Sequence, residues 1–159
     1  MDFKQNITEH FKLSEFVTTT FDRDKLRLEF LAENDVLFRK GELDMIYRFG
    51  RLAGALEYIR KFCGAPIIIL SCYRSSRVNK LVHGSKTSQH RTGSAVDFFC
   101  PSMRADDFFS LVKRALEFHN IEYDQLIFYS RRGFVHLGLF RYNIGTSIRR
   151  PSRRMIIYK

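Results

Sequence analysis

The fold of this chain is decided by ten residues, Ser88-Gln89-His90-Arg91-Thr92-Gly93-Ser94-Ala95-Val96-Asp97. They end within a short apolar run over residues 95–99, which predicts a buried strand. Asp97 lies inside that run, where an unpaired carboxylate would be strongly unfavourable. The sequence therefore predicts that another side chain, or a metal ion, meets this carboxylate in the folded protein.

Two histidines are candidates for that partner. His90 lies seven residues before Asp97, and His136 lies in a second apolar run over residues 134–137. Two imidazoles and one carboxylate form a three-ligand zinc site whose fourth position is left to water, as hydrolytic zinc enzymes require. A hydrogen bond between histidine and aspartate in a protein core explains two of these three residues without a metal. The spacing alone leaves both interpretations open.

The flanking segments predict an α+β domain. Apolar residues at three- and four-residue steps predict two amphipathic helices, over residues 43–64 and 105–119. Short apolar runs predict four strands, over residues 66–71, 95–99, 125–129 and 133–140. The last two of these strands form a hairpin. We therefore expect a small antiparallel sheet flanked by helices.

Four other segments have weaker patterns. Residues 11–16 predict a short helix or turn with Ser14 as its N-cap, and residues 22–40 predict a loop or a short helix. The polar stretch over residues 73–93 has no clear period, and the C-terminal end predicts an irregular basic segment. We expect one domain over residues 1–159, with a basic C-terminal segment over residues 141–159, in a monomeric protein.

The charge is strongly basic and unevenly distributed. The chain has 27 Lys and Arg against 17 Asp and Glu, a net charge of +10, and no acid follows residue 130. A basic surface attracts nucleic acid, anionic lipid or cell-wall polymers, and charge alone does not choose among them. Because no motif for nucleic-acid recognition and no aromatic–basic stacking surface is present, we do not expect nucleic acid as a partner.

Targeting segments are not predicted. The longest apolar stretch covers the six residues 65–70, whereas a membrane-spanning helix needs about 20. The N-terminus has no apolar block and no small-residue cleavage site, so we expect no signal peptide.

The ten residues have the form S-x-H-x-x-G-x-A-x-D, which resembles the zinc-ligand motif of D-alanyl-D-alanine metallocarboxypeptidases and related peptidoglycan endopeptidases. This family shares its fold with the hedgehog signalling domain. Residues 69–75 resemble the family's strand ending in S-G-Y-R-S, with Cys72 where glycine is usual. Residues 123–127 and 134–137 resemble the segment with the last ligand, and residues 11–16 resemble the opening of the small phage-type branch.

The resemblance implies one zinc ion per chain, held by His90, Asp97 and His136 together with one water. It also implies hydrolysis of a D-amino-acid-containing peptide bond in bacterial peptidoglycan. Arg74 would stabilise the developing oxyanion or pair with a substrate carboxylate, or would be only a surface arginine that ends a strand. Ser88 would orient a ligand or the substrate, or would only cap a turn.

The family pattern is broken at the general base, the group that takes a proton from the attacking water. The usual glutamate three residues before the last histidine corresponds to Gly133, and the alternative glutamate at the end of the preceding strand corresponds to Tyr129. One account is that Tyr129, Asp124 or Glu122 assists. Strand alternation puts Asp124 and Tyr129 on opposite faces, so we do not expect them to act together.

Two further accounts of the missing base remain open. His83, which is also a candidate substrate-binding residue, would serve as the base from the polar stretch. Alternatively, the domain binds zinc and the cell wall with little or no hydrolysis. On the leading hypothesis the protein is a metallopeptidase made in the cytoplasm that acts on the bacterial wall, as a virus-encoded phage lysis enzyme does.

Overall fold

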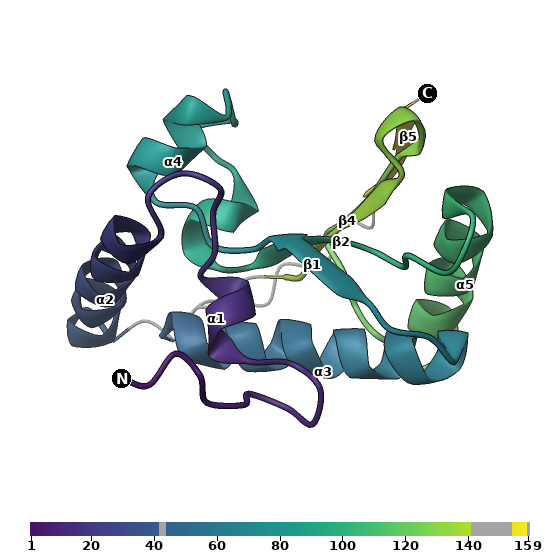
Figure 1. The fold of residues 1–159 in the computed structure, drawn as a ribbon, viewed down its shortest axis with the longest axis horizontal. Helices are drawn as coiled ribbons and strands as arrows, with labels where there is room; N and C mark the ends of the chain where they lie inside the picture. Colours follow the sequence, from purple (N-terminus) through teal and green to yellow (C-terminus); the bar gives the residue numbers. More distant parts are fainter. Residues whose placement is uncertain (42–43, 141–153, 159) are drawn as a thin grey trace.

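The computed structural model describes residues 1–41 and 44–140, and the backbone of residues 154–158. A five-stranded sheet lies at its centre, with the strand order β1-β2-β4-β3-β5 (Figure 1). The strands are β1 (Ile68–Ser71), β2 (Ala95–Phe99), β3 (Gln125–Tyr129), β4 (Phe134–Gly138) and β5 (Arg154–Tyr158). The first four pair in antiparallel fashion, so the predicted α+β class with a small antiparallel sheet is confirmed.

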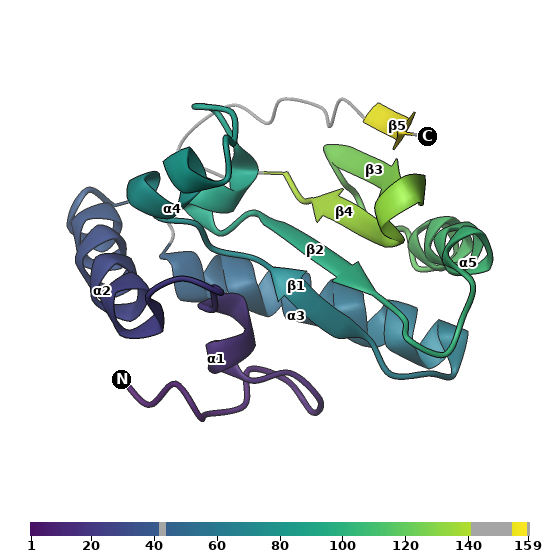
Figure 2. The same ribbon diagram turned by 45° about the horizontal axis from the view of Figure 1, so that its top comes forward.

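The helices cover one face and the two ends of this sheet. They are α1 (Leu13–Phe16), α2 (Arg23–Arg39), α3 (Met45–Cys63), α4 (Ser76–Leu81) and α5 (Ala105–Phe118), with the short 3-10 helices η1 (Gln89–Thr92) and η2 (Ser130–Arg132). Figure 2 shows α3 running beneath the sheet, with α2 and α5 at opposite ends of the molecule. The face turned away from α3 is therefore left to the loops and to η1.

Helix α3 forms the base of the hydrophobic core. Its first turn is capped by Asp44, whose carboxylate accepts a 2.7 Å hydrogen bond from the Tyr47 amide, and it ends at Gly64 in the left-handed conformation. Phe49, Leu52, Leu56 and Ile59 are fully buried beneath the sheet. The helix predicted for residues 43–64 is present, although Leu43 itself lies outside the described residues.

The register of the sheet determines which side chains share a face. Asp97 on β2 pairs with His136 on β4, which in turn pairs with Ile127 on β3. Residues directly opposite each other in a sheet point to the same side, so these three side chains project from the face opposite α3. The next pair, Phe98 and Val135, points into the core.

Two of the weaker predictions are wrong. Helix α2 occupies residues that we expected to form a loop or a short helix, because exposed apolar side chains such as Leu28 and Phe38 obscure the helical face of Leu26 and Phe30. In α1, Lys12 is the N-cap residue and Ser14 lies within the helix. The Glu15 carboxylate accepts a 2.7 Å hydrogen bond from the Lys12 amide and thereby fixes this start.

The C-terminal end is not wholly irregular, because β5 pairs in parallel with β3. Its sequence, Arg-Met-Ile-Ile-Tyr, contains the β-branched and aromatic residues that strands favour. Residues 141–153, with most of the predicted basic C-terminal segment, lie outside the described residues. Among the described residues, no helix has the length and apolar character needed to cross a membrane.

Candidate metal centre

Three ligand atoms converge on the open face of the sheet: Nε2 of His90, Oδ1 of Asp97 and Nδ1 of His136. Nε2 of His90 lies 3.2 Å from Oδ1 of Asp97 and 3.2 Å from Nδ1 of His136, and these last two atoms are 2.7 Å apart. Ligands bound tetrahedrally to zinc at about 2.0 Å lie about 3.3 Å from one another. The three side chains are all buried, and their spacing is close to that of a zinc site.

Both the ring and the backbone of His90 are held by the residues that follow β1. Its Nδ1 lies 2.6 Å from the carbonyl oxygen of Cys72, and its own carbonyl accepts a 3.0 Å hydrogen bond from the Arg74 amide. Because a carbonyl oxygen can only accept, Nδ1 of His90 must hold the ring proton. Nε2 therefore presents a lone pair to the centre, as a metal ligand does.

The glycine of the motif is required by the packing of η1 against α3. Gly93 ends η1 with φ of +65°, and a Cβ atom there would lie 2.7 Å from Cε1 of Phe49. An L side chain would be strained by the backbone and would also collide with this buried ring. The Arg48 guanidinium donates a 3.0 Å hydrogen bond to the Thr92 carbonyl and holds the same turn. Together, these contacts set the height of His90 above the sheet.

Asp97 divides its two oxygens between the histidines and Arg74. Oδ2 accepts a 2.6 Å hydrogen bond from a terminal nitrogen of Arg74, and Nε of Arg74 donates to Oγ of Ser71 at 2.9 Å. Burial acts to raise the pKa of Asp97, but the adjacent His90 and His136 outweigh it and hold that pKa well below its usual range. Burial lowers the pKa of His90. The carboxylate is therefore ionised and His90 neutral at pH 7.

These protonation states fit a metal ion better than a set of hydrogen bonds. With the His90 proton on Nδ1, the only proton available among the three facing atoms is one on Nδ1 of His136. That proton can bridge to Asp97, but the Nε2 lone pair of His90 still faces the Asp97 carboxylate at 3.2 Å. A divalent cation satisfies all three atoms at once. Burial raises the pKa of the Cys72 thiol well above its ordinary value, so Cys72 contributes only its carbonyl.

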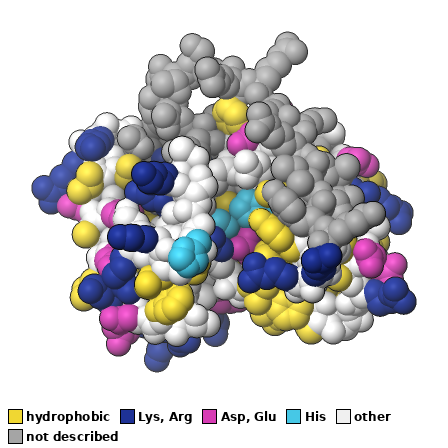
Figure 3. Space-filling model, turned by 90° about the horizontal axis from the view of Figure 1, so that it is seen from above, with side chains coloured by type: hydrophobic (Ala, Val, Ile, Leu, Met, Phe, Trp, Pro, Cys, Tyr) yellow, Lys and Arg dark blue, Asp and Glu magenta, His cyan; other side chains and the backbone are white. Residues whose placement is uncertain are grey.

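A cleft of about 400 Å³ opens above the three ligand atoms. Figure 3 shows histidine and acidic side chains at the bottom of a hollow near the middle of this face, with lysine and arginine side chains around it. Along one side, alternate residues of β3 line the cleft, namely Gln125, Ile127 and Tyr129. The opposite wall is the segment over residues 82–89, between α4 and the ligand His90.

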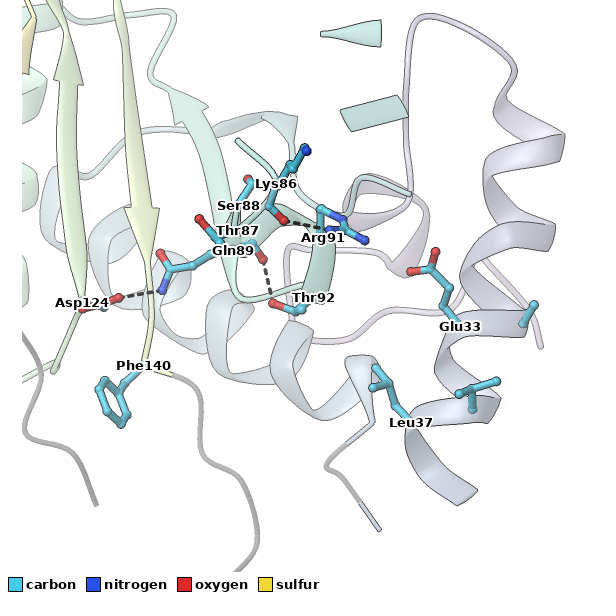
Figure 4. A pocket seen from close by; sticks show the side chains of 12 residues that line it. Glu33, Leu37, Lys86, Thr87, Ser88, Gln89, Arg91, Thr92, Asp124 and Phe140 are labelled. Atoms are coloured by element: carbon cyan, nitrogen blue, oxygen red, sulfur yellow. Dashed lines mark hydrogen bonds between the residues drawn. The ribbon is translucent and has the colours of Figure 1, made fainter. Parts of the chain in front are cut away.

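The structure brings three of the remaining predicted site residues into this cleft and leaves one outside. Ser88, His83 and Tyr129 line it. Asp124 instead lines a neighbouring cavity of about 770 Å³, where its carboxylate accepts a 3.0 Å hydrogen bond from the side-chain amide of Gln89 (Figure 4). The expected separation of Asp124 from Tyr129 is therefore present. Ser88 precedes η1 without a side-chain capping bond, which leaves its hydroxyl to the cleft.

His83 is held in an uncommon backbone conformation. Its φ is +53°, in the left-handed region that non-glycine residues rarely adopt. The following turn is fastened by the buried Asn79, whose amide donates to the carbonyls of Gly84 and Ser85 at 3.1 and 2.9 Å. A strained residue that is maintained by its surroundings is typical of functional sites.

The cleft lacks the glutamate that the family resemblance predicts as general base. Among the described residues that line it, Asp97 is the only carboxylate. Gly133 ends η2 with φ of +69°, and a Cβ atom there would approach Ala105. A glutamate at that position would therefore be strained and would start toward α5.

Sequence reasoning missed several residues of the cleft. Gln125 and Ile127 were detectable from strand alternation with Tyr129, whereas Gln89 lies inside the motif itself. Arg132 and Phe134 also line the cleft. No local pattern marks Arg132, because only the turn of η2 brings it back over the sheet.

Two comparisons with known proteins bear on this site. A search of curated proteins finds no match to this chain. A model of the family described as Peptidase M15 matches residues 10–138, which are 129 of the 159 residues. The matched region contains His90, Asp97 and His136. The chain therefore belongs to the Peptidase M15 family, a family of zinc-dependent metallopeptidases.

Proposed function

We propose that this protein is a zinc metallopeptidase that hydrolyses a D-amino-acid-containing peptide bond in bacterial peptidoglycan. The main support is the convergence of His90, Asp97 and His136 at zinc-like spacing on the floor of a cleft, in a chain of this family. Zinc bound there supplies a Lewis acid and lowers the pKa of water toward ~7. In the reaction the amide C–N bond breaks, the carbonyl carbon gains an oxygen from water, and the nitrogen leaves as a protonated amine.

Arg74 acts in this proposal through Asp97. Its guanidinium is already bound to Asp97 and to Ser71, so it orients the carboxylate that faces the centre. Arg74 also lines the cleft, and in this proposal its positive charge stabilises the negative charge that develops on the carbonyl oxygen. Its role is thus positioning and electrostatic stabilisation.

Proton transfer falls to His83 in this proposal. Asp124 and Glu122 line other cavities and not the cleft, which leaves His83 and Tyr129 as the candidates. Imidazole is the commonest proton-transfer group in enzymes, and His83 is held by its turn on the wall that faces the ligands. The Tyr129 ring is stacked on Phe134 and is better placed to contact the substrate.

The test combines metal content with hydrolysis of purified cell walls. Wild-type protein purified with zinc supplied should contain close to one zinc per chain and release peptide fragments. His90→Ala should lose both, because one of the three ligand atoms is gone. His119→Gln is the matched control, since His119 lies at the end of α5 and stacks on Tyr58 outside the cleft. Wild-type protein without bound metal would refute the proposal.

A second candidate function is a zinc-containing domain that binds the cell wall without hydrolysis. It is favoured by the absence of any carboxylate other than Asp97 among the described residues of the cleft. Such a domain would hold one zinc and bind purified walls, yet release no fragments over long incubation. Fragment release that depends on His83 would exclude it.

We also propose that the substrate is reached at the bacterial envelope, in the manner of a phage lysis enzyme. The net charge of +10 supports this, since wall polymers are anionic. Added to bacteria with permeabilised outer layers, wild-type protein should reduce turbidity, and His90→Ala should not. Equal effects of the two proteins would mean that charge alone disturbs the envelope.

A further inference from the structure

One end of the cleft is formed by an arginine held on an aromatic pair. Tyr129 and Phe134 are partners across β3 and β4, and their rings stack with centroids 4.6 Å apart. The Arg132 guanidinium lies over the Phe134 ring, 5.4 Å from its centroid. All three side chains line the cleft. The aromatic face thereby keeps the cation at this end of the cleft.

The two arginines of the cleft differ in what they already bind. Arg74 is bound to Asp97 and Ser71. Among the described residues, Arg132 forms no ion pair and no side-chain hydrogen bond, and its contact is with the face of Phe134. An arginine with open donors suits a carboxylate, which it binds through two parallel hydrogen bonds.

Arg132 lies near the metal centre along β4. Phe134, whose ring lies under the Arg132 guanidinium, and the ligand His136 are two residues apart on the same face of β4, so their Cα atoms are about 7 Å apart. The terminal carboxylate carbon of a peptide lies about 3.5 Å from the preceding carbonyl carbon. The short separation along β4 therefore suits a carboxylate close to the scissile bond rather than one several residues away.

The opposite end of the cleft has a different character. Its residues there are Gln125, Ser88 and Gln89, which are uncharged. Ser88 and Gln89 also line the neighbouring cavity of about 770 Å³, whose far side is formed by α2 residues such as Glu33 and Leu37 (Figure 4). This end therefore has room for a longer, mixed polar and apolar portion of a substrate.

Building on the proposed function, we propose that Arg132 binds the terminal carboxylate of the substrate and sets its direction. The last residue then lies between the metal centre and the Tyr129–Phe134 pair, and the rest of the peptide runs past Ser88 toward α2. A chain with this arrangement removes one residue from a free carboxyl end.

The experiment compares three forms of a stem pentapeptide ending in D-Ala-D-Ala: the free acid, its C-terminal amide, and a form with only the side-chain carboxylates amidated. The proteins are zinc-loaded wild type, Arg132→Gln and Arg131→Gln. Arg131 is the matched control, because it is the adjacent exposed arginine and does not line the cleft. Binding is measured by calorimetry, and hydrolysis by release of D-alanine or of its amide.

We expect wild type and Arg131→Gln to prefer both forms with a free terminal carboxylate over the terminal amide by about tenfold or more in KM and Kd. Arg132→Gln should lose that preference in KM and Kd while its zinc content stays close to that of wild type. Equal handling of acid and terminal amide by wild type would overturn the inference. Weaker binding of the peptide with amidated side-chain carboxylates would also overturn it. So would a preference of Arg132→Gln for the free acid over the terminal amide.

The binding arm separates this inference from the proposed function. Carboxylate-dependent binding without hydrolysis would support the role of Arg132 and contradict peptidase activity. Hydrolysis of the free acid and the terminal amide at equal rates would support peptidase activity and remove Arg132 as the carboxylate-binding residue.

Discussion

The carboxylate of Asp97 does two different things with its two oxygens. Oδ1 faces the imidazoles of the metal centre, and Oδ2 accepts the hydrogen bond from Arg74. Because the carboxylate is planar, fixing Oδ2 also fixes the direction of Oδ1. Arg74 is therefore a positioning residue, whose effect should be measured on the metal before it is measured on the reaction.

Arg74→Gln should weaken zinc binding by about 10- to 100-fold, because the carboxylate loses its orienting partner. Competition with a chromophoric chelator measures this affinity directly. Arg77→Gln is the control, since Arg77 pairs with Glu29 on α2 and does not line the cleft. Unchanged zinc affinity in Arg74→Gln would contradict the positioning role.

The resemblance predicts a glutamate as general base at the position of Tyr129, and because Tyr129 lines the cleft this exchange can be tested. Tyr129→Glu should raise kcat by at least about tenfold, since a positioned acid–base group contributes about 10²–10⁴. Tyr129→Phe is the control for loss of the hydroxyl. Gly133→Glu should give no gain because of its φ of +69°. A kcat for Tyr129→Glu no higher than that of Tyr129→Phe would contradict this prediction.

Single residues also show what the sequence reveals and what it hides. His90 and Asp97 are close in sequence and belong to one motif, so their meeting was predictable, and the apolar run around His136 pointed to the same centre. The hydrogen bonds from Arg74 to Asp97 and from Gln89 to Asp124 were not predictable, because they depend on where separate elements cross. Long-range contacts of polar side chains leave no local pattern.

At the scale of elements, the metal centre depends on how η1 lies against α3. The turn that ends in Gly93 contacts the Phe49 ring, and the Thr92 carbonyl is held by Arg48. Both contacts come from the first two turns of α3. The height of one metal ligand is thus set by a helix on the other side of the sheet.

Gly93→Ala should destabilise the fold by about 1–3 kcal/mol, through backbone strain at φ of +65° and collision with Phe49. Gly54→Ala is a control in which we expect stability to change in the opposite direction, because Gly54 lies within α3 and a Cβ atom there meets nothing within 4 Å. It should stabilise by up to about 1 kcal/mol. Urea unfolding monitored by circular dichroism measures both. Equal stability of Gly93→Ala and wild type would be incompatible with the described packing.

The elements differ in how well their patterns predicted them. Helices α3 and α5 were detectable because their apolar residues follow one face, and β2 because its short apolar run follows a long polar stretch. Helix α2 was not, since Leu28 and Phe38 remain exposed on it. Strand β5 was hidden by the arginines before it, although its apolar residues favour a strand.

At the scale of the whole molecule, the centre joins parts of the chain that are distant in sequence. His90 and Asp97 come from η1 and β2, and His136 comes from β4, beyond α5. An ion bound by all three stabilises the folded state only, since the unfolded chain does not hold them together.

Zinc at about 1,000 times its Kd should add about 4 kcal/mol to the free energy of unfolding and raise Tm by about 10 °C. Differential scanning calorimetry of the protein with and without zinc measures the shift. His90→Ala should show almost none of it. A Tm that zinc leaves unchanged in wild type would mean that the ion does not bind at this centre.

Two of the three ligands are on β2 and β4, which are interior strands, each hydrogen-bonded to a neighbour on both sides. Interior strands open only in the rarest fluctuations of a protein, whereas edges and loops open often. Asp97 and His136 therefore move away from the ion only in near-global events, so we expect His90 on η1 to detach first, with the ion leaving into the cleft. The residence time of the metal should follow hydrogen exchange at the amides of η1 rather than at those of the sheet.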